Sequence, residues 1–86
     1  MQIVFHRDFK KRYKKLQRGE RQKTDERLLV LEKEPFHPIL NNHPLHYPYE
    51  GCRSINITGD LRAIYEHIGS HAVHFIRLGT HPELYG

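Results

Sequence analysis

A proline-rich stretch in the middle of the chain, residues 35–50, separates two halves with different hydrophobic periodicity. It holds four of the five prolines of the 86-residue sequence, together with the pair Asn41-Asn42. Because proline lacks a backbone donor and fixes φ, neither a helix nor a central strand continues through such a stretch. We therefore expect an irregular connection between a helical half and a strand half, within one domain spanning residues 1–86.

The first half predicts a short strand and two helices. Residues 2–5 read as the strand, and the pattern then changes to helical spacing at Phe9, Tyr13 and Leu16. These three side chains share one face of a helix that begins at Arg7 and ends near Gly19. A second helix over residues 20–33 follows, and Pro35 prevents its continuation.

The second half predicts a three-stranded antiparallel meander. A three-residue turn at residues 58–60 sets Ile55 beside Ala63, and a two-residue turn at Gly69-Ser70 joins the next pair of strands. The second turn fixes a register that we state as an expectation, with these neighbours: Leu61 beside Leu78, Arg62 beside Arg77, Ala63 beside Ile76 and Tyr65 beside His74. The aliphatic residues then share one face, and the sheet packs on the helices in an α+β fold.

Charge is concentrated in the first helix. The formal net charge is +4 and the pI is about 9.4, and residues 7–23 hold nine of the fourteen Lys and Arg residues. Such a cluster favours a polyanionic partner, and the candidate RNA-binding cations are Lys10, Lys11, Lys14, Lys15 and Arg18. The alternative is that they form a solvated face.

The rest of the composition favours a protein of the reducing cytoplasm. The single cysteine, Cys52, cannot form an internal disulfide. The apolar run at residues 1–5 is far shorter than a secretory or membrane segment, so we expect neither export nor membrane insertion.

Two arginines dominate the chemistry of the strand half. In the expected register Arg62 and Arg77 repel one another, with Asn56 on the next strand, and a bound anion relieves that repulsion. Paired guanidinium groups on rigid strands can hold a phosphodiester and stabilise the charge that grows as it is cleaved. The register also predicts that Arg62→Ala raises the stability of the free protein. The alternative is that both arginines are solvated or pair with Glu66 and Glu83.

Candidate proton-transfer groups surround this pair. Asp60 precedes Arg62 in the turn, His81 follows Arg77, and His43 lies in the preceding loop. RNA is cleaved without a metal when a base activates the 2′-hydroxyl and an acid protonates the departing 5′ oxygen. A metal site at His67, His71 and His74 is disfavoured because strand alternation scatters them, so we expect no metal or cofactor.

The motifs resemble one family. The closing string Arg77-Leu78-Gly79-Thr80-His81-Pro82-Glu83-Leu84-Tyr85-Gly86 and three upstream segments, 43–45, 51–53 and 59–65, are similar to the YafQ branch of the RelE/ParE toxin superfamily. The order of elements resembles that fold over the whole chain.

The resemblance implies a toxin that cuts mRNA in the ribosomal A site and is held inactive by a cognate antitoxin. It implies a general acid/base pair at His43 and His81, an assisting carboxylate at Asp60, and a transition-state clamp at Arg77. Tyr85 takes the place of the C-terminal aromatic residue. Arg62 matches an arginine of the RelE branch.

The chain departs from YafQ-like toxins on the first strand of the meander, where it has Ser54 and Asn56 in place of an aspartate and a histidine. Two other functions share the fold. One is a ParE-like gyrase inhibitor that binds protein, and the other is an inactive relative that only contacts RNA or ribosomes. The set of histidine, aspartate and arginine residues favours the nuclease, because a pure binder has no need of it.

Overall fold

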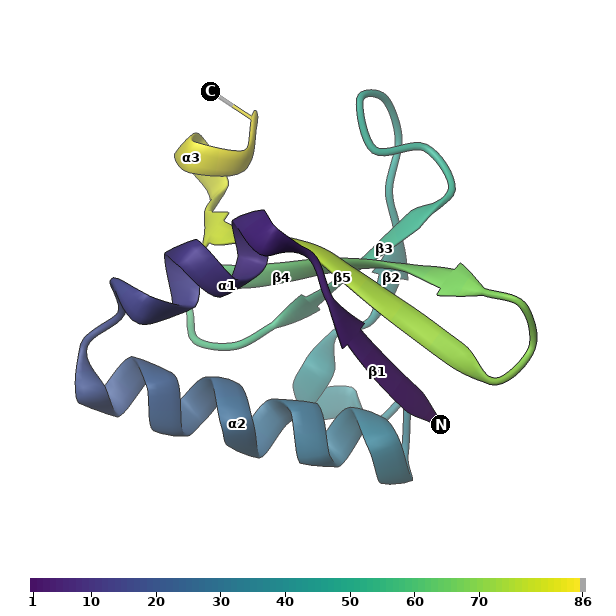
Figure 1. Ribbon diagram of the computed structural model, residues 1–86, viewed down its shortest axis with the longest axis horizontal. Helices are drawn as coiled ribbons and strands as arrows, with labels where there is room; N and C mark the ends of the chain where they lie inside the picture. Colours follow the sequence, from purple (N-terminus) through teal and green to yellow (C-terminus); the bar gives the residue numbers. More distant parts are fainter. Residues whose placement is uncertain (86) are drawn as a thin grey trace.

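The computed structural model describes residues 1–85 and has one five-stranded sheet in the order β1-β5-β4-β3-β2 (Figure 1). Its elements are β1 (Gln2–Phe5), α1 (Arg7–Lys14), α2 (Arg18–Lys33), a 3₁₀ turn (Pro38–Leu40), β2 (His43–Pro44), β3 (Cys52–Asn56), β4 (Leu61–Ile68), β5 (Ala72–Thr80) and α3 (His81–Tyr85). All neighbouring strands are antiparallel except β1 and β5, which are parallel. The predicted α+β fold is confirmed.

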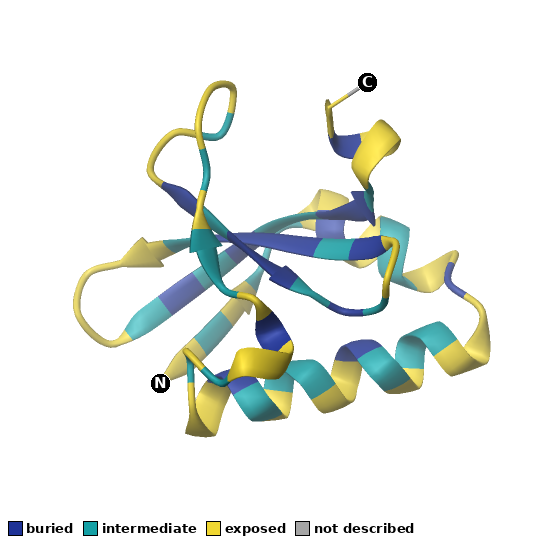
Figure 2. Ribbon diagram, turned by 180° about the vertical axis from the view of Figure 1, so that it is seen from behind, coloured by how far each residue is buried: buried dark blue, intermediate teal, exposed yellow. Residues whose placement is uncertain are grey.

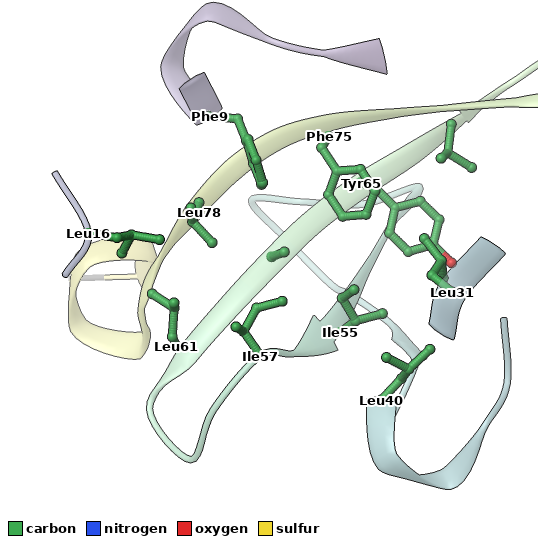
Figure 3. Packing of buried hydrophobic residues seen from close by; sticks show 12 residues of the cluster. Phe9, Leu16, Leu31, Leu40, Ile55, Ile57, Leu61, Tyr65, Phe75 and Leu78 are labelled. Atoms are coloured by element: carbon green, nitrogen blue, oxygen red, sulfur yellow. The ribbon is translucent and has the colours of Figure 1, made fainter. Parts of the chain in front are cut away.

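The hydrophobic core lies between the sheet and the helices α1 and α2. Phe9, Leu16 and Leu31 from the helical half pack with a set of fully buried strand residues (Figure 3), namely Ile55, Ile57, Leu61, Tyr65, Val73 and Phe75. Each such side chain contributes about 1.5–3 kcal/mol by leaving water. Buried residues concentrate in the middle of the sheet, whereas the hairpin tip and the outer side of the helices are exposed (Figure 2).

The helix boundaries differ from the prediction. Helix α1 ends at Lys14, earlier than Gly19, and α2 begins at Arg18. Glu20 sets this start, because its Oε1 accepts a hydrogen bond of 3.2 Å from the backbone N–H of Gln17, the residue before the helix. Gly19 therefore lies inside α2, where the spacing of apolar residues gave no sign of a helix.

The β3–β4 register is confirmed, with Ile55 opposite Ala63 and Asn56 opposite Arg62. The expected β4–β5 register is wrong. Arg62 lies opposite Gly79, and Arg77 lies opposite Ile64. The expected repulsion between two directly opposed arginines is therefore absent.

Two one-residue changes cause this difference. The loop between β4 and β5 has three residues, 69–71, and Gly69 adopts the left-handed conformation with φ 60°. A β-bulge then interrupts the register at Ile64/Tyr65. Near the loop the shift is one residue, so Tyr65 faces Phe75 and not His74, and past the bulge it is two residues. A shift of two leaves Arg62 and Arg77 on the same face, displaced along the strands.

The bulge also moves Ile76 out of the main core. This side chain packs with Cys52, Ile64 and Leu84 on the opposite face of the sheet. The proline-rich connection is more regular than predicted, because β2 within it pairs with β3, placing His43 opposite Ser54.

Candidate functional site

The face of the sheet away from α2 carries the candidate site. The β2–β3 loop rises on one side of this face and α3 on the other (Figure 1). One row of directly paired positions crosses it, running through His43, Ser54, Ile64 and Arg77. Because paired positions share a face, His43 and Arg77 lie on the same side of the sheet. Three strand spacings separate their Cα atoms, roughly 14 Å across the sheet.

Arg77 is held by groups from two other segments. Its Nη1 donates a hydrogen bond to the Tyr49 hydroxyl at 3.1 Å, and its Nη2 donates to the Glu83 carbonyl at 3.4 Å. The Tyr49 hydroxyl in turn donates to the Leu84 carbonyl at 2.9 Å. Sequence reasoning missed Tyr49, because it lies in the proline-rich connection and no local pattern points to it.

Helix α3 places Tyr85 against Tyr49, the hydrogen-bond partner of Arg77, and His81 against Tyr85. The two rings lie with centroids 4.7 Å apart, and the Tyr49 ring meets Tyr85 edge-on at 5.4 Å. Burial raises the pKa of the Tyr85 phenol, and nearby Tyr49 and Cys52 raise it further. Tyr85 therefore stays protonated at neutral pH and can donate a hydrogen bond.

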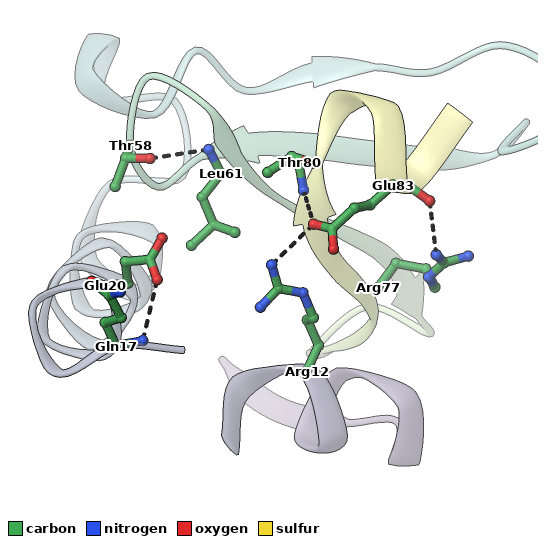
Figure 4. A network of polar contacts seen from close by, with 8 residues as sticks. All are labelled: Arg12, Gln17, Glu20, Thr58, Leu61, Arg77, Thr80 and Glu83. Atoms are coloured by element: carbon green, nitrogen blue, oxygen red, sulfur yellow. Dashed lines mark hydrogen bonds and ion pairs between the residues drawn. The ribbon is translucent and has the colours of Figure 1, made fainter. Parts of the chain in front are cut away.

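Local contacts fold α3 back over the end of β5 (Figure 4). Glu83 Oε1 accepts hydrogen bonds from the Thr80 backbone N–H at 2.8 Å and from Arg12 Nη2 at 3.0 Å. These hydrogen bonds lower the pKa of the Glu83 carboxyl to about 2, with Arg12 the larger cause. Gly79 permits the close approach, because a Cβ there would lie 3.2 Å from Glu83 Oε1 and 3.3 Å from Glu83 Cβ.

His43 is poised as an acceptor. Its Nδ1 lies 2.7 Å from the Asn41 carbonyl oxygen, which can only accept a hydrogen bond. In the neutral ring this contact places the proton on Nδ1, so that the lone pair lies on Nε2.

Asp60 is exposed in the turn before β4. Leu61 pairs with Thr80 at the end of the β4–β5 ladder; Asp60 precedes that pair in the turn, and His81 follows it as the first residue of α3. Arg62 is engaged locally, since its Nη1 donates to the carbonyls of Thr58 at 3.0 Å and Gly59 at 2.8 Å. It clamps the turn that carries Asp60.

The two positions that depart from the YafQ-like pattern lie on the same face. Ser54 is buried between His43 and Ile64 in the row of paired positions. Asn56 faces Arg62, and its Oδ1 is buried and, within residues 1–85, has no hydrogen-bond partner. The structure therefore places a serine and an amide at the two positions where the resemblance implies an aspartate and a histidine.

The cations of α1 fall into two sets. Lys10 and Lys14 line an apolar groove of about 390 Å³ between α1 and α2, with four apolar or aromatic residues, Phe5, Phe9, Tyr13 and Leu28, and with Asp25. Lys11 and Lys15 line a polar hollow of about 240 Å³ together with Asp8, Arg12, Arg77, Leu78 and Glu83. Arg18 is exposed at the start of α2 and lines neither.

The hollow lies where α1 meets the end of β5 and the start of α3. Strand β1 pairs with β5 only over Ala72–Phe75, and α1 also packs on β5. The hollow adjoins the open face, because Arg77 belongs to both.

Two further findings concern residues 1–85. No group of three or more His, Cys, Asp or Glu side chains there is placed to hold a metal ion. No helix in this part of the chain is long and apolar enough to cross a membrane.

Comparison with known proteins identifies the family. Residues 1–86 match the family model described as the bacterial toxin of a type II toxin-antitoxin system, YafQ. The chain belongs to this family. A comparison with curated proteins gave no match.

Solved structures agree with this assignment. The chain is similar to YafQ from E. coli strain BL21(DE3), with a TM-score of 0.83 and 25% identity over 98% of this chain and 97% of that one. It is also similar to the toxin in the E. coli DinJ-YafQ toxin-antitoxin complex, with a TM-score of 0.81 and 25% identity over 98% and 96%. A YoeB/ParE toxin from Agrobacterium tumefaciens shares the fold, with a TM-score of 0.79 and 21% identity over 94% and 99%.

Proposed function

We propose that this toxin is a ribosome-dependent endoribonuclease that cleaves translated mRNA by acid/base chemistry on the open face of the sheet. One observation carries the proposal. Arg77 is fixed next to α3 by the Tyr49 hydroxyl and the Glu83 carbonyl, and the Tyr49 ring contacts Tyr85, which in turn lies against His81. A cation held on a rigid strand, in one cluster with a phenol and an imidazole, suits a phosphodiester.

In the proposed reaction, a base removes the proton of the ribose 2′-hydroxyl, and the oxygen attacks the adjacent phosphorus. The bond from phosphorus to the 5′ oxygen breaks, and an acid protonates that oxygen. This yields a 2′,3′-cyclic phosphate and a 5′-hydroxyl. The free Nε2 of His43 suits the base, and His81 suits the acid. Arg77 stabilises the charge on the phosphoryl oxygens.

The remaining candidates have supporting roles in this proposal. Asp60 assists the proton transfer from the turn before β4, and Arg62 holds that turn in place. Tyr85 orients the nucleotide through its ring and hydroxyl. Asn56 lies on the same face and offers an amide to the RNA.

The basic surface of α1 completes the RNA-binding site. Lys11 and Lys15 share the hollow with Arg77 and are therefore placed to contact phosphates near the cleavage site. Lys10, Lys14 and Arg18 extend the positive surface toward ribosomal RNA. A cognate antitoxin holds the toxin inactive by covering this surface, in keeping with the DinJ-YafQ complex of E. coli.

The test uses a translating extract in which the 5′ ends of an mRNA are mapped after adding the toxin. We expect new ends within codons for the parent chain and none for His81→Ala or Arg77→Ala. Lys33→Ala, at the far end of α2, is the control of equal charge loss to Arg77→Ala and keeps full activity. Translation without cuts, or unimpaired cutting by both site variants, would overturn the proposal.

A DNA-supercoiling assay checks the competing function. Inhibition of gyrase by the parent chain, without RNA cleavage, would assign the protein to the ParE-like class.

A further inference from the structure

We propose that Glu83 is a positioning residue, and that its bond to Arg12 fastens the histidine-bearing helix α3 to α1. This inference rests on the proposed function for its catalytic consequence. Its structural part stands separately.

Helix α3 is too short to be stable without contacts to the rest of the protein. A helix of five residues makes almost no internal hydrogen bonds and does not persist by itself in water. Its apolar anchor is a single buried side chain, Leu84, whereas His81, Pro82, Glu83 and Tyr85 are exposed. The position of α3, and with it the His81 ring, therefore depends on polar contacts with the rest of the protein. The Leu84 carbonyl accepts one of these from Tyr49 at 2.9 Å, and the others involve Glu83.

Glu83 supplies two of those contacts through one oxygen. Oε1 accepts from the Thr80 N–H at 2.8 Å, which begins the helix, and from Arg12 at 3.0 Å, which reaches it from α1. The first contact is local in sequence, whereas the second spans 71 residues and joins two elements. The backbone carbonyl of Glu83 also accepts from Arg77. Glu83 thus contacts Thr80 at the start of α3, Arg12 of α1, and Arg77, the residue proposed to bind the phosphate.

The loss of the Glu83 contacts is expected to lower kcat. His81 lies between Thr80 and Glu83 in sequence, so any loosening of the carboxylate lets the first turn of α3 move. Small displacements of a reacting group cost large factors in rate. Glu83 lines the hollow beside Lys11 and Arg77, but a carboxylate repels a phosphate, so the loss of Glu83 lowers kcat more than it raises KM.

The first experiment is made on the free protein and does not depend on activity. Backbone heteronuclear NOE values are measured for residues 80–85 in the parent chain, Glu83→Ala, Glu83→Gln, Arg12→Ala and Arg12→Lys. We expect lower values in both alanine variants. Glu83→Gln keeps an oxygen for the Thr80 N–H and Arg12→Lys keeps a cation, so each recovers part of the order. Arg7→Ala removes a charge from the exposed start of the same helix and leaves α3 unchanged.

The second experiment measures mRNA cleavage by the same variants. Arg12→Ala and Glu83→Ala are expected to lower kcat by about tenfold or more, with partial rescue of kcat by Arg12→Lys. Glu83→Ala is expected to change KM less than about twofold, whereas Arg12→Ala also removes a cation from the hollow assigned to RNA contact and is expected to raise KM as well. The double variant Arg12→Ala/Glu83→Ala is expected to lose no more than the worse single variant, because both remove one contact.

Unchanged NOE values in both alanine variants would overturn the fastening. So would a double variant whose loss in kcat equals the product of the two single losses. If instead the parent chain cuts no RNA while α3 loosens as described, the proposed function fails and the fastening stands. Should Glu83→Ala fail to fold, Glu83→Gln and the Arg12 pair decide the question.

Discussion

Tyr49 and Arg77 are hydrogen-bonded across the open face, although they lie 28 residues apart in the chain. The Tyr49 hydroxyl accepts from Arg77 at 3.1 Å and donates to the Leu84 carbonyl at 2.9 Å, so one oxygen links the loop, the strand and α3. A phenylalanine fills the same space without either bond. Tyr49→Phe is therefore expected to lower the free energy of unfolding by about 1 kcal/mol, measured by urea denaturation, and to slow cleavage severalfold.

The control for this variant is Tyr47→Phe. Tyr47 lies in the same loop with 85% of its surface exposed, and the loss of its hydroxyl is expected to change neither quantity. Equal effects of the two substitutions on the free energy of unfolding and on cleavage would show that the hydrogen bonds of the Tyr49 hydroxyl do not contribute to either.

Arg62→Ala is expected to destabilise the protein, opposite to the sequence-based prediction. Arg62 Nη1 donates to the carbonyls of Thr58 and Gly59, and no directly opposed arginine repels it. The expected fall in the free energy of unfolding is about 1 kcal/mol, with cleavage slowed because the turn carrying Asp60 loosens. A thermal melt measures the change, and a higher Tm for the variant would contradict the role of a turn clamp.

Protonation of Glu83 at low pH is expected to lower the stability of the protein. The folded-state pKa of about 2 is lower than the ordinary value of 4.5, so this carboxylate stabilises the fold fully above pH 4.5. The contribution is lost as the pH falls from about 4.5 toward 2. Urea denaturation at pH 6 and pH 3 compares the parent with Glu83→Gln. The parent should lose more stability than the variant, and parallel losses in the two proteins would refute the assignment.

The two lysine pairs of α1 are expected to differ in RNA binding. Lys11→Ala/Lys15→Ala and Lys10→Ala/Lys14→Ala remove equal charge from one helix, but only the first pair shares the hollow with Arg77. Two phosphate contacts to single-stranded RNA correspond to a slope of about 1.4 in a plot of log Kd against log salt concentration. In the first double variant the slope should be smaller by most of this amount, and in the second the reduction should be less. Fluorescence anisotropy of a labelled RNA measures both, and identical slopes would argue against the hollow as an RNA contact.

Local patterns in the sequence were sufficient to predict most of the fold. The spacing of Phe9, Tyr13 and Leu16 placed α1 on the core, and the Thr58–Asp60 turn fixed the register of β3 against β4. The β4–β5 register was beyond such reasoning. A loop of two or three residues fits Gly69-Ser70-His71 equally well, and a bulge has no local signature at Ile76.

Only those residues of the candidate site that are close to one another in sequence could be predicted to lie together. The motif from Arg77 to Tyr85 forms one strand end and one helical turn, so its residues were bound to be neighbours; its last residue, Gly86, lies outside the described residues. Tyr49 and Arg12 reach this site from a loop and from α1 through contacts 28 and 71 residues apart. No periodicity encodes such contacts.

The parallel pairing of β1 with β5 has a consequence for how the chain folds. Gln2 and Phe5 have Ala72 and Phe75 as their strand partners, so the sheet closes only after β1 meets a strand about 70 residues further along the chain. Closure of so long a loop is slow compared with local helix formation. The pairing of β1 with β5 is therefore expected to form later in folding than the β4–β5 hairpin, whose partners are close in sequence.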